Sequence, residues 1–130
     1  MRISGPVLDT DDVPRLTRFY ERLLGWTVTD REEPRPGEPP GAGWSRLRSP
    51  GGDTKVEIQW EAVYERPAWP PAASRQQMMM HLDIAVDDLD AGVAWALDAG
   101  ATLAEHQPQD GVRVMLDPAG HPFCLFADVG

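Results

Sequence analysis

Residues 12–25 read DVPRLTRFYERLLG, and residues 88–100 read DLDAGVAWALDAG. Each stretch opens on aspartate, a residue that caps helix N-termini, and closes on glycine, a residue typical of helix ends. Apolar residues in the first stretch recur at helical spacing, which predicts an amphipathic helix that ends before Gly25. The second stretch predicts a matching helix over Leu89–Ala99, with an inward face made of Leu89, Val93, Ala96 and Leu97 and with Trp95 in the core.

The segments that follow the two helices are also alike. In each half a turn with proline and glycine precedes a short apolar strand: SPGG (49–52) before VEI (56–58), and DPAG (117–120) before FCL (123–125). The order strand, helix, three strands is therefore written twice. We predict an α+β fold of two βαβββ modules in a single domain spanning residues 1–130, with modules at 1–60 and 78–130 and a linker at 61–77. The predicted strands are Ile3–Asp9, Trp26–Asp30, Trp44–Arg48, Lys55–Trp60, Met78–Val86, Ala101–His106, Val112–Leu116 and Pro122–Ala127.

Charge and composition argue against several classes of partner. Twelve basic and twenty-one acidic residues give a formal net charge of −9, which repels phosphate backbones and anionic lipid heads. We therefore expect neither nucleic acid nor a membrane surface as a partner. No apolar run reaches the roughly 20 residues that span a bilayer, and no signal-like segment opens the chain, so a soluble cytoplasmic protein is expected. Cys124 is the only cysteine, so no intrachain disulfide can form.

The residues around the second helix resemble a known superfamily. The run HLDIAVDDLD (81–90), together with AGA (99–101) and DPAGHPFCL (117–125), is similar to the vicinal oxygen chelate superfamily, and in particular to its glyoxalase-like domain. In the first half, FY (19–20) and LLGW (23–26) resemble the helix end of the same superfamily. The resemblance implies a curved mixed sheet around a cleft between the two modules, and a homodimer.

The resemblance also implies four metal-ligand positions, one on the first strand and one on the last strand of each module. Counting back seven residues from the aspartates that open the helices gives Gly5 and His81, and the last strands give Glu57 and Cys124. Gly5 has no donor atom, and Cys124 replaces a hard carboxylate with a soft thiol. We therefore predict no metal cofactor. The alternative is zinc held by His81, Glu57 and Cys124, since thiolate and imidazole both suit this ion.

Strand alternation predicts which side chains share the face of the cleft, because residues two apart in a strand point the same way. His81 and Glu57 are the predicted catalytic pair. A carboxylate, from Glu57 or from Asp83, would orient the imidazole and raise its basicity. The ligand-binding side chains predicted on the same face are Met79, Asp83, Gln59, Trp44, Arg46, Cys124 and Phe126.

This lining suits a small hydrophobic, oxygen-bearing ligand that a few hydrogen bonds orient. The leading hypothesis is a glyoxalase-like small-molecule-binding protein, or a metal-independent enzyme of the lyase or isomerase type with His81 as general base. One alternative is a drug- or toxin-sequestering protein of the bleomycin-resistance type, for which an acidic surface favours cationic ligands. A second alternative is a zinc-dependent glyoxalase-like lyase. An iron dioxygenase is disfavoured because its set of two histidines and one carboxylate is missing.

Overall fold

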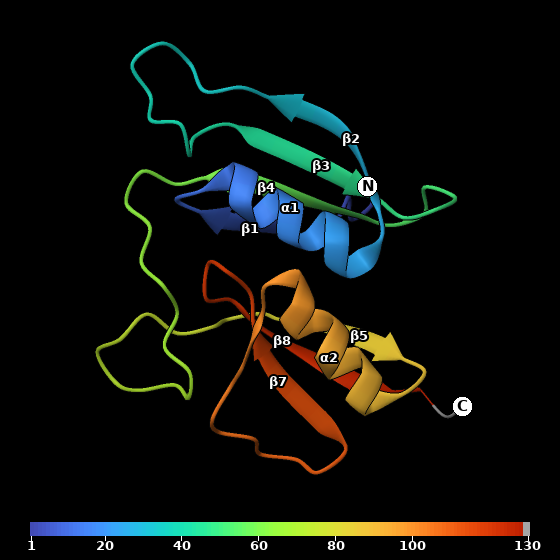
Figure 1. Ribbon diagram of the computed structural model, residues 1–130. Helices are drawn as coiled ribbons and strands as arrows, with labels where there is room; N and C mark the ends of the chain where they lie inside the picture. Colours follow the sequence, from blue (N-terminus) through green and yellow to red (C-terminus); the bar gives the residue numbers. More distant parts are fainter. Residues whose placement is uncertain (129–130) are drawn as a thin grey trace. The chain divides into compact units, whose positions relative to one another are not determined.

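The computed structural model describes residues 1–128 and shows two helices and eight strands within them (Figure 1). Its contacts divide the chain into two compact units, Met1–Tyr64 and Glu65–Gly130. Each unit has the order strand, helix, three strands, which confirms the predicted α+β fold of two βαβββ modules. The first unit contains β1 (Val7–Thr10), α1 (Val13–Leu24), β2 (Thr27–Glu32), β3 (Trp44–Arg48) and β4 (Lys55–Trp60). The second contains β5 (Leu82–Val86), α2 (Leu89–Ala99), β6 (Thr102–Leu103), β7 (Val112–Leu116) and β8 (Pro122–Ala127).

Helix α1 begins and ends at the signals that its sequence predicts. The side chain of Asp12 accepts a hydrogen bond from the backbone N–H of Arg15 at 3.1 Å, and the N–H of Gly25 donates to the carbonyl of Glu21 at 3.0 Å. A cap contributes about 1 kcal/mol, whereas burying one large apolar side chain contributes roughly 2–3 kcal/mol. The apolar stripe therefore stabilises this helix more than its caps do. The stripe buries Leu16, Phe19 and Tyr20.

The sheet of unit one has the strand order β1-β4-β3-β2. β1 runs parallel to β4, while β4, β3 and β2 are antiparallel neighbours. Helix α1 packs against β3 and β4, where Leu47, Val56 and Ile58 are buried. Because strand residues alternate between faces, the opposite face carries the polar and charged residues. These are Arg46, Arg48, Lys55, Glu57 and Gln59, and the aromatic side chain of Trp44 lies on the same face.

Residues 33–43 connect β2 to β3 without regular secondary structure, and β2 itself runs to Glu32, two residues past its predicted end. The far end of this loop is anchored to the helix. The carbonyl of Gly41 accepts the N–H of Val13 at 2.8 Å, which satisfies one of the amides that the first turn of α1 leaves without an intrahelical partner. Ala42, the next residue, is buried.

Unit two repeats this arrangement with the strand order β5-β8-β7-β6. The side chain of Asp88 caps α2 by accepting from the N–H of Ala91 at 2.8 Å, and the helix stops at Gly100 as predicted. α2 packs against β6, β7 and β8. Among residues 1–128, no helix combines the length and the hydropathy needed to cross a bilayer. The buried apolar side chains of this unit include Ala96, Met115, Phe123 and Leu125.

Three strands are shorter than predicted, because each is limited to the residues that pair with a neighbouring strand. β1 begins at Val7 rather than Ile3, and Val7 pairs with Glu57. β5 begins at Leu82 rather than Met78, because its neighbour β8 starts at Pro122 and offers nothing before that residue to pair with. β6 stops at Leu103 instead of reaching His106. The alternation of apolar residues does not reveal these partner-dependent ends.

The prediction that Trp95 and Leu97 face the core is wrong. The exposed fraction is 55% for Trp95 and 46% for Leu97. Residues of a helix share a face when they lie three or four positions apart, and Trp95 lies two positions after Val93 and one before Ala96. Ala96 is the residue of α2 that is fully buried. A stripe through Val93 and Ala96 therefore turns Trp95 away from the sheet.

Candidate functional site

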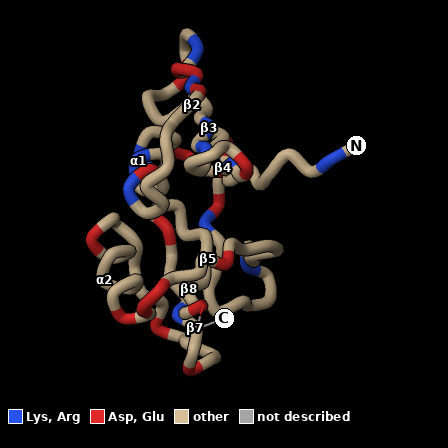
Figure 2. The backbone as a smooth tube through the Cα atoms, turned by 90° about the vertical axis from the view of Figure 1, so that its right-hand side faces the viewer, with Lys and Arg blue, Asp and Glu red and all other residues tan. Residues whose placement is uncertain are grey.

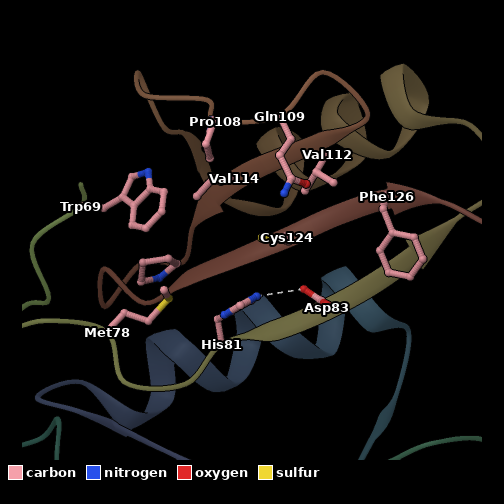
Figure 3. A pocket seen from close by; sticks show the side chains of 11 residues that line it. Trp69, Met78, His81, Asp83, Pro108, Gln109, Val112, Val114, Cys124 and Phe126 are labelled. Atoms are coloured by element: carbon pink, nitrogen blue, oxygen red, sulfur yellow. Dashed lines mark ion pairs between the residues drawn. The ribbon is translucent and has the colours of Figure 1, made fainter. Parts of the chain in front are cut away.

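A cavity of about 440 Å³ lies in unit two (Figure 3). Its floor is the face of the sheet that carries Asp83, Cys124 and Phe126, together with Val112 and Val114 of β7. Two irregular segments complete its walls: the chain before β5, and the connection from β6 to β7. These segments contribute Trp69, Met78, Pro108 and Gln109.

Most of the cavity wall is apolar. Trp69 lies at one end (Figure 3), and its indole N–H donates to the backbone carbonyl of His106 at 3.2 Å. Because the polar atom of the indole is already bonded, its ring face is the part available to a ligand. Aromatic rings bind to such surfaces by removing water from apolar area on both partners. The wall therefore favours a planar apolar ligand.

The polar edge of the cavity consists mainly of His81 and Asp83. Imidazole Nε2 lies 3.0 Å from the Oδ1 atom of Asp83, and the exposed fractions of the two side chains are 38% and 63%. His81 immediately precedes β5, and Asp83 is its second residue, so both side chains point to the same face. Asp83 is thus the carboxylate that orients the imidazole, which was one of the two predicted partners.

Cys124 lies beside this pair on the neighbouring strand, where it is in register with Asp83. Burial raises the pKa of the Cys124 thiol, and the negative charge of Asp83 raises it further. The thiol is therefore protonated at neutral pH, which does not suit a nucleophile. The donor atoms of His81, Asp83 and Cys124 all lie within 4.8 Å of one another.

Replacing Asp83 with asparagine is expected to lower the pKa of the Cys124 thiol, because the charge that disfavours the thiolate is removed. Burial remains, so the pKa stays above its ordinary value of 9.0. Alkylation by iodoacetamide at a fixed pH should become about threefold faster, because the thiolate is the form that reacts. The reaction is followed by mass spectrometry on the single cysteine. Asp87→Asn is the control, and equal rates in the two variants would contradict the prediction.

In unit one, the residue equivalent to Cys124 is Glu57. Val7 and Asp83 each lie five residues before the aspartate that caps the following helix. Val7 pairs with Glu57, and Asp83 pairs with Cys124. Glu57 forms ion pairs with Lys55 and, at 3.4 Å, with Arg46, and its side chain is 15% exposed. The hydrogen bond from Lys55, with the positive charges of both neighbours, holds its pKa below the ordinary value. Acidic and basic residues lie close together along β3 and β4 (Figure 2).

Gly5 occupies the position equivalent to His81, as the residue count predicts. A Cβ atom at Gly5 would lie 2.9 Å from the backbone carbonyl oxygen of Lys55, closer than real Cβ atoms approach. A histidine could not replace this glycine without moving the backbone of β4. The close approach of the two strands therefore explains why unit one offers no imidazole here.

The other predicted residues of unit one lie on the same face of the sheet as Glu57. Arg46 stacks over the ring of Trp44, with 5.0 Å between its guanidinium carbon and the ring centroid, and forms an ion pair with Asp30 at 3.2 Å. Trp44 and Gln59 are paired residues that line a separate polar hollow of about 300 Å³ beside the loop 33–43. Trp44, Arg46 and Gln59 therefore gather on the face of Glu57, and their role in ligand binding stays a prediction.

Met79 does not line the cavity of unit two. It is 86% exposed and precedes β5, so the alternation that was extended to it from His81 does not apply. Met78 lines the cavity in its place. The pairing of Glu57 with His81 also stays a prediction, since the two residues belong to different units.

Several lining residues were not predicted from the sequence. Val112 and Val114 could have been found, because they hold the positions on β7 that Trp44 and Arg46 hold on β3. Pro108 and Gln109 lie in a segment without periodicity, where no alternation rule applies. Trp69 lies in the segment between the two modules, where no alternation rule applies either.

Comparison with known proteins agrees with this geometry. The family model described as a glyoxalase-like domain matches residues 6–126. The chain belongs to this family. A sequence search of curated proteins found no match to this chain.

Solved structures share the fold of this glyoxalase-like domain. The glyoxalase family protein from Enterococcus faecalis is 21% identical, with 96% of both chains covered and a TM-score of 0.68. The fosfomycin resistance protein FosX from Mesorhizobium loti is 16% identical, covers 96% of this chain and 90% of its own, and gives a TM-score of 0.66. A mutant of FosX from Listeria monocytogenes, complexed with Mn(II) and 1S,2S-dihydroxypropylphosphonic acid, is 12% identical. It covers 98% of this chain and 91% of its own, and gives a TM-score of 0.66. These structures share the fold, and the family model confirms the glyoxalase-like domain that the motifs predict.

Proposed function

We propose that this glyoxalase-like domain binds a small hydrophobic, oxygen-bearing molecule in the cavity of unit two. The observation that carries the proposal is the His81–Asp83 pair at the edge of an otherwise mostly apolar cavity of about 440 Å³. Apolar walls with few polar groups are typical of small-molecule sites: the walls provide affinity, and the polar groups set orientation. A ligand with a single ring or two fused rings, and with one oxygen atom, fits this description.

His81 is the residue that could act chemically on such a ligand. When Nε2 carries the proton that it shares with Asp83, Nδ1 is the acceptor of the neutral ring. A proton taken from the ligand would create an imidazolium, which the Asp83 carboxylate stabilises. This is the arrangement of a general base, and it suits a metal-independent reaction of the lyase or isomerase type.

Glu57 does not line the cavity of unit two, so its predicted part in ligand binding is kept only as that of a polar anchor on the sheet of unit one. Its carboxylate is shared by Lys55 and Arg46, and its lowered pKa keeps it ionised at neutral pH. A group in this state accepts hydrogen bonds well and is a weak source of protons. General acid chemistry is therefore not assigned to it.

Sequestration without turnover is the alternative that the charge distribution favours. The chain carries a net charge of −9, and Asp83 places a carboxylate at the edge of the cavity with 63% of its side chain exposed. Both features attract cationic aromatic compounds. A sequestering protein would bind such compounds saturably and release them unchanged.

A zinc site is the second alternative, and one observation favours it: the donor atoms of His81, Asp83 and Cys124 lie within 4.8 Å of one another. This set replaces the predicted Glu57 with Asp83. Imidazole, thiolate and carboxylate all suit zinc, whereas Mn(II) prefers oxygen ligands. Zinc bound here would polarise an oxygen atom of the ligand. The thiol would first have to lose its proton, so zinc binding should weaken as the pH falls.

The proposal is tested with two probes of similar shape, 2-naphthol and naphthalene, whose affinities are measured by fluorescence titration. His81→Ala should weaken 2-naphthol binding by about tenfold, the value of one hydrogen bond, and leave naphthalene binding almost unchanged. Asp83→Asn should have a smaller effect in the same direction, because it removes only the orienting group. Asp87→Asn serves as the exposed control.

Four outcomes would redirect the proposal. If the wild type binds neither probe, or if both probes weaken equally in His81→Ala, the cavity is not a site with a polar anchor. Oxygen-bearing ligands are incubated with the protein and then analysed by mass spectrometry. A new product indicates catalysis, whereas unchanged ligand indicates sequestration. Stoichiometric zinc in protein purified without chelator, lost in both His81→Ala and Cys124→Ser, would favour the zinc alternative.

A further inference from the structure

The backbone hydrogen bonds between β6 and β7 end after a few residues, and the side chain of Gln107 continues the pattern. The two strands pair only at Thr102 with Leu116 and at Leu103 with Met115. One more backbone bond follows, from the N–H of Ala104 to the carbonyl of Val114 at 3.0 Å. The equivalent strand of unit one, β2, has six residues. In unit two the chain instead turns out of the sheet after Ala104.

The carboxamide of Gln107 occupies the place of the missing backbone amide. Its Oε1 atom accepts the N–H of Val114 at 2.8 Å, and its Nε2 group donates to the carbonyls of Ala104 at 2.8 Å and Val114 at 2.9 Å. Val114 is 3% exposed and Ala104 is 5% exposed, so water cannot easily satisfy these backbone groups. A buried N–H or carbonyl without a partner is costly, and the three bonds therefore hold Gln107 firmly.

The segment that Gln107 holds forms one side of the cavity. Pro108 and Gln109 follow it directly and line the cavity (Figure 3). His106 precedes it, and its carbonyl accepts the indole N–H of Trp69, which lines the cavity from another part of the chain. The position of one carboxamide thus determines the position of two parts of the cavity wall.

Only a primary amide matches this set of partners. The site needs one acceptor and two donors on the same planar group, which glutamine supplies and glutamate does not. A glutamate would keep the bond from the Val114 N–H but would place a carboxylate against the carbonyls of Ala104 and Val114. Alanine would remove all three bonds.

We propose that Gln107 is a positioning residue that sets the width of the cavity and, through it, the size of ligand that the domain accepts. The part that concerns ligands rests on the proposed function. The part that concerns the segment 104–111 stands on its hydrogen bonds alone. Gln107 touches no ligand in this proposal and acts through Pro108, Gln109 and Trp69.

The experiment compares 2-naphthol with the larger 1-hydroxypyrene in the wild type, Gln107→Ala and Gln107→Glu. The wild type should bind one of the two probes more tightly than the other. In both variants the ratio of the two affinities should fall towards one, by about tenfold, because each variant loses hydrogen bonds that hold the cavity wall. Gln76→Ala, an exposed glutamine outside the cavity lining, is the matched control and should keep the wild-type ratio. An unchanged ratio in both variants would overturn the ligand part of the proposal.

Gln107→Glu adds a pH readout that a merely structural role would not give. A protonated carboxyl group regains one donor, so the affinity ratio of this variant should return towards the wild-type value as the pH falls. The affinity ratio of the wild type is measured in the same buffers, and any change in it is subtracted. This accounts for the other ionisable groups of the segment and the cavity edge, which are Glu105, His106, Asp110, His81 and Asp83. A ratio that stays low at acid pH would contradict the donor argument.

Hydrogen exchange separates failure of this inference from failure of the proposed function. The amide of Val114 should exchange faster in Gln107→Ala by about tenfold, while the amide of Ile58 in unit one should keep its rate. This measurement needs no ligand. If neither probe binds but Val114 exchanges faster, the proposed function fails and the positioning role stands. If Val114 exchanges at the wild-type rate, the positioning role fails.

Discussion

Gly43→Ala is expected to lower the free energy of unfolding by about 3 kcal/mol and Tm by about 10 °C. Gly43 joins the loop 33–43 to β3 with a φ angle of +111°, a conformation that residues with a side chain rarely adopt. A Cβ atom there would come closer than 3.0 Å to the carbonyl oxygen of Glu32, which is backbone and cannot rotate away. The substitution therefore combines backbone strain with a collision at the start of a central strand. Urea unfolding at neutral pH measures the loss.

Two other glycines serve as controls for this prediction. Gly37 lies in the same loop with a φ angle of +88°, but nothing lies within 4 Å of the position of its Cβ atom. Gly37→Ala should cost about 1 kcal/mol from φ alone. Gly111 has open space and no positive φ angle, so Gly111→Ala should change stability little. If Gly43→Ala costs no more than Gly37→Ala, the collision with Glu32 does not occur.

Elements with local signals could be predicted from the sequence. Asp12, Gly25, Asp88 and Gly100 mark helix ends through bonds within a few residues, and both helices begin and end where these residues indicate. Strands β3, β4, β7 and β8 also have their predicted ends. Each of them pairs with a neighbour that is close in the sequence, so that turn residues and alternation together define the register.

Elements that depend on distant partners could not be predicted in this way. Whether residues 78–81 form a strand depends on where β8 begins. β6 stops at Leu103, and beyond it the side chain of Gln107, rather than a strand, bonds to Val114. The site shows the same division. Asp83 and Cys124 follow from alternation and register, whereas Trp69 and Pro108 come from segments without periodicity.

Glu57→Ala is expected to lower the free energy of unfolding by about 2 kcal/mol at neutral pH. The substitution leaves Lys55 and Arg46, whose side chains are 11% and 25% exposed, without the carboxylate that they share. Two positive charges on the same face of the sheet would then repel each other with little water to screen them. Asp30→Ala is the matched control. Asp30 is bonded to Arg46 but is 47% exposed, so its loss should be small.

The contribution of Glu57 should also depend on pH in a defined direction. The hydrogen bond from Lys55, helped by the charge of Arg46, lowers the pKa of Glu57 in the folded state below its ordinary value of 4.5. A group with a lowered pKa stabilises the fold above its unfolded-state pKa, and this stabilisation is lost as the pH falls through the folded-state value. Wild type and Glu57→Gln should therefore differ in urea unfolding at neutral pH, and the difference should shrink as the pH falls below 4.5. A difference that persists at acid pH would show that packing rather than charge is responsible.

Stability and ligand binding at Glu57 can be measured independently of each other. Glu57→Gln keeps the size of the side chain and removes its charge, so it should reduce stability through Lys55 and Arg46 whether or not Glu57 contacts a ligand. If Glu57 is also a polar anchor, 2-naphthol binding should weaken by about tenfold in this variant and naphthalene binding should not. If both probes keep their wild-type affinities while stability falls, Glu57 is a structural ion-pair residue, and the polar anchoring of the ligand belongs to His81 and Asp83 alone.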